Sequence, residues 1–251
     1  MEKEYAKLTS FIEARAAAHP KSKFLVAIAG APGSGKTTIA AEVVRRINEI
    51  HPPKLHSDVA DDTTPGEIPH AALLSMDGFH LPRSTLDTLP NRTEAYARRG
   101  APFTFDLKLF LAFMTALRKW GDCSPSGLLT IYAPSFSHTK KDPIQNGISI
   151  PASTSILIIE GNYLLLNEPG WKEVASMVDL RVLISADLAV TRDRVARRHV
   201  RAGIEGSLED AYRRVDGNDT LNGRLIQEKV VDGVDLVIHS VDDEHCSLTR
   251  D

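Results

Sequence analysis

The sequence predicts an α/β fold of three layers, with a five-stranded parallel sheet between helices. Five short runs rich in Val, Ile and Leu are apolar at nearly every position, as in strands that are buried on both faces. These runs are "KFLVAIAG" (23–30), "AALLSMD" (71–77), "SILIIEG" (155–161), "LRVLISA" (180–186) and "VDLVIHS" (234–240). Helical patterns fall at 36–50, 106–120, 187–202 and 207–215. Strands that alternate with helices indicate a doubly wound sheet, in which ligands bind beyond the carboxyl ends of the strands.

The length and composition favour a single large domain over residues 1–251. The chain has 251 residues, of which 42% are hydrophobic, and this is enough for a substantial core. Its 30 Lys and Arg nearly balance its 33 Asp and Glu, so charge gives no argument for nucleic acid or a membrane surface as a partner. No apolar run reaches the length of a membrane span. The sequence leaves open whether the protein forms a homodimer. The two cysteines, Cys123 and Cys246, form no disulfide framework, and a reducing, cytoplasmic compartment is expected.

Three segments lie outside the pattern of alternating strands and helices. Residues 1–22 predict an amphipathic N-terminal helix that stops at Pro20. Residues 51–70 are rich in proline and acidic side chains, which predicts an exposed, flexible insert. Residues 134–154 predict a second long loop with a polar centre, and "GLLTIYAP" (127–134) could add one strand.

The first predicted strand leads into "GAPGSGKTT", which matches the pattern G-x-x-x-x-G-K-[ST] and is followed by a helical pattern. Strand, glycine loop and helix are the context in which this motif binds a nucleoside triphosphate such as ATP. The glycines let several backbone N–H groups point at one anion, and the helix N-terminus adds positive potential. Lys36 can reach the β- and γ-phosphates, and the Thr37 hydroxyl can bind Mg²⁺. The predicted nucleotide-binding residues are Gly30, Ala31, Pro32, Gly33, Ser34, Gly35, Lys36, Thr37 and Thr38.

Two carboxylates, Asp77 and Glu160, stand at the ends of predicted strands. The Asp-Gly pair at 77–78 could be only a turn that closes a hairpin, but no second alternating run follows it. In a parallel sheet the end of a neighbouring strand lies beside the γ-phosphate, where a carboxylate can accept a proton or hold a metal-bound water. Asp77 is therefore a candidate base, and Glu160 a candidate ligand of Mg²⁺ at the Walker B position. Which of the two is the base and which is the main metal ligand stays open.

The helical pattern at 187–202 carries Arg194, Arg198 and Arg201 on one face, at spacings of four and three residues. A basic helix face is commonly just solvated. After a strand of a P-loop domain, however, the same pattern is typical of a lid whose arginines close over the transferred phosphoryl group. The sequence therefore predicts a lid at 192–215, with Arg194 and Arg198 as catalytic residues.

Together these segments resemble the phosphoribulokinase/uridine kinase family of P-loop kinases, with most likeness to the bacterial-type pantothenate kinase branch. Besides the P-loop, the stretches that carry the resemblance are "MDGFHLP", "RRGAPFTFD" (98–106), "SFSHTKKDP" (135–143), "IIEGNYLLL" (158–166), "RDRVARRHVRAGI" (192–204) and "GNDTLNGRLI" (217–226). They span most of the chain in the family's order. One departure is Asp-Gly-Phe-His, where uridine kinases usually have Asp-Ser-Phe-Tyr.

The resemblance implies roles for individual residues. The family's base falls on Asp77 and its Walker B carboxylate on Glu160. A stretch near the adenine falls on Asn218, Asp219 and Asn222. The family's acceptor pocket draws on residues here identified as His80, Arg98, Asp106, Tyr132 and His138.

The leading functional hypothesis is an ATP-dependent kinase that transfers the γ-phosphoryl group of Mg·ATP to a hydroxyl of a small molecule. Nucleosides, pantothenate-like compounds and sugars are all open as acceptors. The alternative is an ATPase or an ATP-sensing module that acts through a protein partner. The absence of N-K-x-D and L-S-G-G-Q patterns disfavours a signalling GTPase and a transporter ATPase. A nucleic-acid processing ATPase is disfavoured by the balanced charge.

Overall fold

The computed structural model describes residues 1–52, 69–122 and 129–241. The helices are α1 (Glu2–Ala17), α2 (Lys36–Ile50), α3 (Arg83–Leu86), α4 (Arg92–Ala97), α5 (Leu107–Asp122), α6 (Lys172–Ser176), α7 (Leu188–Arg201), α8 (Leu208–Gly217) and α9 (Asp219–Glu228). The strands are β1 (Phe24–Gly30), β2 (Ala71–Ser75), β3 (Ile131–Ser137), β4 (Asp142–Ile150), β5 (Ile156–Gly161), β6 (Leu180–Ser185) and β7 (Leu236–His239). Two 3₁₀ helices are η1 (Met76–Phe79) and η2 (Pro102–Thr104).

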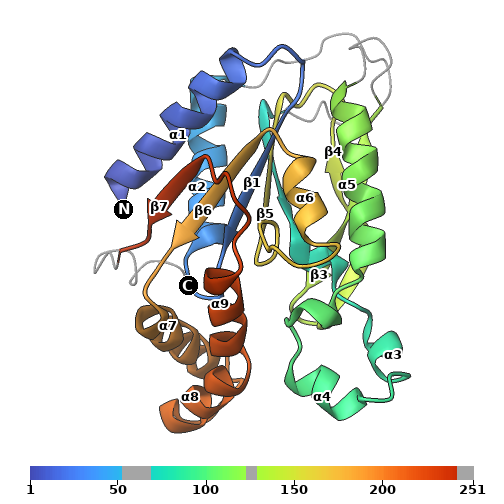
Figure 1. The fold of residues 1–251 in the computed structure, drawn as a ribbon, viewed down its shortest axis with the longest axis vertical. Coiled ribbons are helices and arrows are strands. Elements are labelled where there is room, and N and C mark those ends of the chain that lie inside the picture. The colour runs from blue at the N-terminus through green and yellow to red at the C-terminus, as the bar shows by residue number, and fades with distance from the viewer. Residues whose placement is uncertain (53–68, 123–128, 242–251) are drawn as a thin grey trace.

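Five parallel strands form the central sheet in the order β2-β5-β1-β6-β7, which confirms the predicted α/β architecture. Helices α1 and α2 cover one face of this sheet, and α5 and α6 cover the other (Figure 1). The remaining helices gather at the carboxyl ends of the strands, with α7, α8 and α9 on one side and α3 and α4 on the other (Figure 1). This end of the sheet therefore holds the P-loop and every element predicted to surround a nucleotide.

The apolar strands are buried on both faces, and this explains why their sequences do not alternate. All seven residues of β1 are buried. Leu25 and Ala27 belong to the core that includes Phe110 of α5, whereas Val26 and Ile28 belong to the core beneath α1 and α2. A strand with an apolar core on each side has no position left for a polar side chain until it reaches its end.

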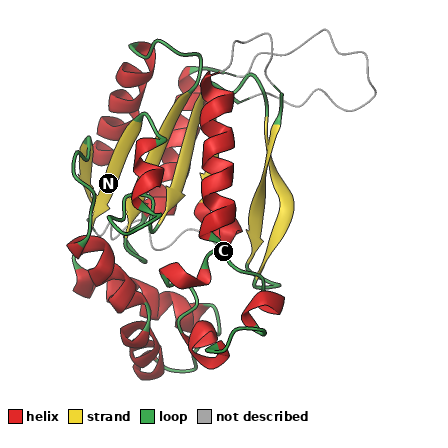
Figure 2. Ribbon diagram, turned by 45° about the vertical axis from the view of Figure 1, so that its right-hand side comes forward, coloured by secondary structure: helices red, strands yellow, loops and turns green. Residues whose placement is uncertain are grey.

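A second sheet corrects the prediction of a long loop at 134–154. Strands β3 and β4 pair as an antiparallel hairpin that stands beside the central sheet (Figure 2). The sequence carries no clear strand signal for this hairpin, because much of β4 is exposed and its apolar and polar residues do not alternate regularly. An irregular register between Ala133 and Ser135, and positive φ angles at Lys141 and Asn146, further break the period-two pattern.

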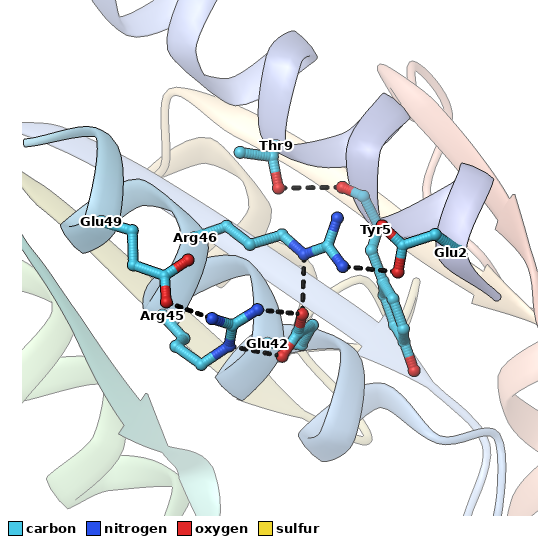
Figure 3. Close-up of polar contacts among 7 residues, drawn as sticks. All are labelled: Glu2, Tyr5, Thr9, Glu42, Arg45, Arg46 and Glu49. Carbon is cyan, nitrogen blue, oxygen red and sulfur yellow. Dashed lines mark hydrogen bonds and ion pairs between the residues drawn. The ribbon is translucent and has the colours of Figure 1, made fainter. Parts of the chain in front are cut away.

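An ion-pair network fixes α1 to α2 (Figure 3). Arg46 donates hydrogen bonds to Glu2 of α1 and Glu42 of α2, and its guanidinium lies 5.4 Å from the centre of the Tyr5 ring. Arg45 also donates to Glu42, and these hydrogen bonds hold the pKa of the Glu42 carboxyl at about 2. The network places the first residues of α1 beside the P-loop, where they line the cavity described below.

Several parts of the sequence prediction need correction or fall outside the described residues. Between η1 and α5 lie the short helices α3, α4 and η2, which the sequence pattern did not predict. Within the flexible insert predicted at 51–70, residues 53–68 lie outside the described part of the chain, as do Cys123 and Cys246. Within the described ranges, no helix combines the length and the apolar character that crossing a bilayer requires.

Candidate active site

The P-loop connects the end of β1 to the start of α2 in the geometry that the sequence predicts. Gly33 and Gly35 have φ angles of +80° and +84°, which side chains with a Cβ rarely adopt. The Ser34 N–H donates to the Ala31 carbonyl at 3.0 Å, which closes the turn of the loop. The backbone thus curls around a space at the N-terminus of α2, where an anion is favoured.

Thr37 and Glu160 meet at the centre of the site. Glu160 is the fifth residue of β5 and pairs in register with Ile28 of β1 and Ser75 of β2. The Thr37 hydroxyl donates a hydrogen bond of 3.0 Å to Glu160 Oε2, and Glu160 is only 3% exposed. A hydroxyl and a buried carboxylate side by side form the kind of oxygen donor set that Mg²⁺ prefers.

Lys36 shares this site with both carboxylates. Burial lowers the pKa of the Lys36 ammonium, the charges of Glu160 and Asp77 oppose that shift, and the charge of Arg198 adds to it. Asp77, Glu160 and Arg198 therefore each lie within electrostatic reach of Lys36. A phosphate group bound here would supply the negative charge that keeps the lysine protonated.

Asp77 lies in η1, directly after the end of β2. Its N–H donates to Ser75 Oγ at 3.3 Å, and no described residue donates a hydrogen bond to its carboxylate. Gly78 follows because the chain is crowded and not because the turn needs a positive φ angle: a Cβ there would lie 2.0 Å from the Pro134 carbonyl oxygen. The close approach of η1 to β3 fixes the backbone around Asp77 and leaves its carboxylate available.

His80 lies beside Asp77 in a group of packed rings, here called the aromatic group, that also contains Phe105, Phe136 and His138. Its Nδ1 lies 2.8 Å from the Asp77 carbonyl oxygen, and its ring centre lies 4.0 Å from Phe105 and 4.9 Å from Phe136. Burial lowers the pKa of His80, although the charge of Asp77 acts in the opposite direction. The ring of His138, an exposed residue, is 5.4 Å from Phe136. The structure therefore brings His80 and His138 to the same aromatic group.

Two other residues of the predicted acceptor pocket have different surroundings. Asp106 accepts a hydrogen bond of 2.9 Å from the Leu109 N–H and so caps the N-terminus of α5. Tyr132 is 57% exposed and pairs with Ser149, far along β3 from His138. The structure does not bring Tyr132 to the aromatic group, because a strand rises about 3.3 Å per residue.

The arginines of α7 face the P-loop as the sequence predicts. Arg194 Nη1 donates to the Gly33 carbonyl at 3.2 Å and to Ser240 Oγ at 2.9 Å. Arg198 and Arg201 line a cavity of about 390 Å³, whose other lining residues are Met1, Tyr5, Gly33, Gly35, Lys36, Thr37, Thr38, Ile39, Arg194, Val195, Ser240 and Val241. Arg194 is thus already bonded to the phosphate loop, whereas Arg198 points a charge into the space beside it.

Two other arginines of α7 are paired with acidic side chains. Arg192 bonds Asp216 and Arg197 bonds Asp193, so neither belongs to the cavity. Asp187 caps the helix by accepting from the Ala189 N–H at 2.7 Å. Together α7 and α8 form a helical pair over residues 188–217, which corresponds to the predicted lid region.

Arg98 joins residues that the sequence assigned to two different ligands. Its Nε donates to Asn218 Oδ1 and its Nη2 to Asn222 Oδ1, both at 3.1 Å. Asn222 also donates to Asn218 Oδ1 at 3.1 Å, and Asn218 donates to the Arg99 carbonyl at 2.9 Å. Neither asparagine lines the cavity beside the P-loop. The predicted acceptor residue and the predicted adenine residues therefore form one buried network.

The structure adds Tyr163 and Arg99, which the sequence did not single out, and it gives Asp219 surroundings that the family resemblance did not imply. Tyr163 Oη donates to the Gly100 carbonyl at 2.5 Å, and burial raises the pKa of this phenol. Arg99 donates to the Leu81 carbonyl at 3.0 Å, which ties residues 98–100 to the segment after His80. Asp219 lies within electrostatic reach of Lys36, and burial raises the pKa of its carboxyl. The quoted family stretches were the one signal for them.

Together, the fold and the site define the class of protein to which the chain belongs. A parallel sheet, a P-loop at the end of its central strand, two carboxylates beside that loop and a basic helix over it characterise a P-loop kinase. The sequence model of the phosphoribulokinase/uridine kinase family matches residues 25–215. The chain belongs to this family, whose P-loop kinase fold implies the use of ATP.

Individual relatives agree with this assignment. The chain is 34% identical over 211 residues to a Schizosaccharomyces pombe protein named "putative uridine kinase", in an alignment that covers 84% of this chain and 81% of the relative. It is 34% identical over 206 residues to the ATP-dependent kinase YFH7 of Kluyveromyces lactis, with 69% of this chain and 58% of that protein covered. The match therefore spans less than two thirds of the longer YFH7 protein.

Two solved structures resemble the whole fold. The crystal structure of YFH7 from Saccharomyces cerevisiae aligns with a TM-score of 0.80 and 26% identity over 96% of this chain and 99% of that one. A structure from Silicibacter sp. TM1040 described as a "putative fructose transport system kinase" aligns with a TM-score of 0.75 and 26% identity. It covers 93% of this chain and 98% of its own.

Proposed function

We propose that this protein transfers the γ-phosphoryl group of ATP to a hydroxyl group of a small-molecule metabolite. The observation that carries the proposal is the position of Asp77. Its carboxylate stands at the end of β2, within electrostatic reach of Lys36, and no described residue donates a hydrogen bond to it. A protein that only hydrolysed or sensed ATP would not need a carboxylate reserved for the proton of an acceptor.

Different residues of this chain carry out the separate parts of the phosphoryl transfer. The acceptor oxygen forms a bond to the γ-phosphorus while the bond to the β,γ-bridging oxygen breaks, and ADP leaves. Asp77 takes the proton that the acceptor hydroxyl loses. Lys36 and Arg198 stabilise the negative charge on the phosphoryl oxygens, because their cations are positioned before the reaction begins.

The oxygens of Thr37 and Glu160 fit a divalent cation. Their 3.0 Å contact places a hydroxyl and a carboxylate where both can bind one Mg²⁺, directly or through its waters. When bound, Mg²⁺ neutralises charge on the β- and γ-phosphates. The buried position of Glu160 keeps its oxygen aimed at the first turn of α2.

The acceptor is proposed to bind on the other side of Asp77, beside the aromatic group of His80, Phe136 and His138. Flat rings near a base suit an acceptor with a ring of its own, such as a nucleoside or a sugar, because aromatic faces pack against such rings. A pantothenate-like acceptor would use the same hydroxyl chemistry. Names of relatives include uridine kinase and fructose transport system kinase, which are consistent with the first two classes.

The proposal is tested by measuring ADP release from ATP and Mg²⁺ with a panel of nucleosides, pantothenate-like alcohols and sugars. We expect at least one compound to raise ADP release well above the rate of hydrolysis, with formation of its phosphate ester confirmed by mass spectrometry. Unstimulated hydrolysis across the panel, with ATP bound normally, would instead favour the alternative of an ATPase or sensing module that acts through a protein partner.

A further inference from the structure

We propose that Glu13, His51 and His70 form a binding site for a zinc-like divalent metal, separate from the kinase site. The potential ligand atoms of these three residues all lie within 4.8 Å of one another. Two imidazole nitrogens and one carboxylate oxygen are a donor set that Zn²⁺ prefers over Mg²⁺. Three protein ligands leave the fourth tetrahedral position to a water molecule.

Three separate elements hold these ligands in place. Glu13 belongs to α1, one residue after the fully buried Ile12. His51 caps the C-terminus of α2, and its N–H donates to the Ile47 carbonyl at 2.9 Å. The carbonyl of His70 accepts from two successive N–H groups at the start of β5, at 2.9 and 3.1 Å. The backbone of the site is therefore fixed before any metal arrives.

The contacts within the cluster leave a polar atom without a partner. His51 Nε2 lies 2.6 Å from Glu13 Oε2, and the rings of His51 and His70 lie 4.3 Å apart at 31°. The second carboxylate oxygen, Glu13 Oε1, is buried and has no hydrogen-bond partner among the residues that the structure describes. A cation bound between the two imidazoles and Glu13 would give this carboxylate oxygen a partner.

The site has room for an ion and its water. All three residues line a cavity of about 210 Å³, together with Phe24 and Ile156. In a tetrahedral zinc site the donor atoms lie about 3.4 Å apart, as follows from bonds of about 2.1 Å. The present separations of up to 4.8 Å therefore have to shorten toward that spacing when a metal binds.

The metal would stabilise the fold and would take no part in phosphoryl transfer. Phe24, which lines the cavity, is the first residue of β1, whereas the P-loop begins at Gly30, the last residue of that strand. Seven residues of strand separate the two ends by about 20 Å. A metal here would join α1 to the two chain positions 51 and 70, and closing a long connection in this way stabilises the folded state.

The test is calorimetric titration of Zn²⁺ into the full-length protein after chelation, with saturating ADP and Mg²⁺ present to occupy the kinase site. We expect one tight Zn²⁺ per chain. His51→Ala and His70→Ala should each weaken it more than about ten-fold, because a direct ligand matters at least as much as an outer-shell partner. Glu13→Gln, which keeps the shape of the side chain, should weaken it as well. His239→Ala is the matched control, since His239 is an exposed histidine on β7 outside the cluster.

A second readout guards against misfolded variants. Zn²⁺ should raise the thermal unfolding temperature of the wild type and of His239→Ala, and raise it much less in Glu13→Gln. Retained ADP binding shows that each variant is folded. Equal zinc affinity in wild type and in the His51 and His70 variants would overturn the proposal, and so would a wild type that binds no Zn²⁺ once ADP and Mg²⁺ are bound.

Discussion

Thr37 Oγ1 donates a hydrogen bond of 3.0 Å to Glu160 Oε2, and this contact joins the first turn of α2 to the end of β5. The two residues are 123 positions apart in sequence. Because β5 is the direct neighbour of β1, the register of the sheet brings the end of β5 beside the P-loop. The contact therefore ties the two proposed metal ligands to the buried sheet.

Thr37→Ala should raise the Mg²⁺ concentration needed for half-maximal activity by about ten-fold or more, because one oxygen ligand is lost. Thr37→Ser keeps the hydroxyl and should behave nearly as the wild type. The measurement is ADP release against Mg²⁺ concentration at fixed ATP. An unchanged Mg²⁺ requirement in the alanine variant would mean that Thr37 does not bind the metal.

Arg198→Ala should lower kcat by about 100-fold with little change in ATP affinity, because a preformed cation acts mainly on charge that develops in the transition state. Arg197→Ala is the matched control, since Arg197 is bonded to Asp193 outside the cavity. The measurement is kcat together with the Kd of ATP. Equal losses in both would place Arg198 in ground-state binding.

Arg194→Ala should behave differently and weaken ATP binding as well as kcat. Its guanidinium holds the Gly33 carbonyl and Ser240, so its loss loosens the phosphate loop itself. The sequence alone predicted the same role for both arginines, because their spacing on one helix face gives no indication of which of them contacts the loop. A normal Kd for ATP in this variant would contradict the structural distinction.

Asn222→Ala should destabilise the fold by about 1–3 kcal/mol, because it leaves Arg98 Nη2 without its acceptor and removes one of the two donors to Asn218 Oδ1. Glu228→Ala, at the exposed end of the same helix, should have little effect. Urea unfolding measures the difference. A normal stability combined with a large loss of ATP affinity would favour the adenine-binding role that the family resemblance implies.

The Arg98 network shows why part of the site could not be predicted. The P-loop and the strand ends are contiguous motifs with a known context, so the sequence placed Lys36, Asp77 and Glu160 correctly at one end of the sheet. Arg98 and Asn222 are 124 positions apart, and no local pattern states that their side chains meet. The resemblance assigned them to different ligands, whereas the folded chain joins them.

The lack of a local pattern also explains where the predicted fold was wrong. The five core strands were predictable because each must be apolar on both faces. The β3–β4 hairpin packs only a few residues, such as Ala133 and Ile150, against the core, so its sequence carries little periodic signal. The Asp-Gly pair could indicate a turn, but Gly78 is required by the close approach of the Pro134 carbonyl.

The stability of the protein should fall with acidity in a way that depends on His80. Burial lowers the pKa of His80 in the folded state below its ordinary value. Between that lowered pKa and the ordinary value near 6.5, the unfolded chain binds a proton that the folded chain does not, so the free energy of unfolding rises with pH. His80→Gln should reduce this slope, and His199, whose pKa burial also lowers, should account for part of what remains. Identical slopes in urea unfolding from pH 5 to 7 would contradict the burial of a neutral His80.

The central claim is that Asp77 accepts the proton of the acceptor hydroxyl. Asp77→Asn keeps the size of the side chain and leaves the P-loop, Thr37 and Glu160 intact. Asp87→Asn, an exposed aspartate that bonds Arg92, is the control.

The decisive measurement is the rate of phosphoryl transfer to an acceptor found in the panel, taken together with the Kd of Mg·ATP for the same variant. The account predicts a Kd close to that of the wild type and a transfer rate lowered by about 10²–10⁴-fold, the range that a positioned base contributes. Weaker ATP binding with a shifted Mg²⁺ requirement would assign Asp77 to the metal instead. An unchanged transfer rate would contradict the account.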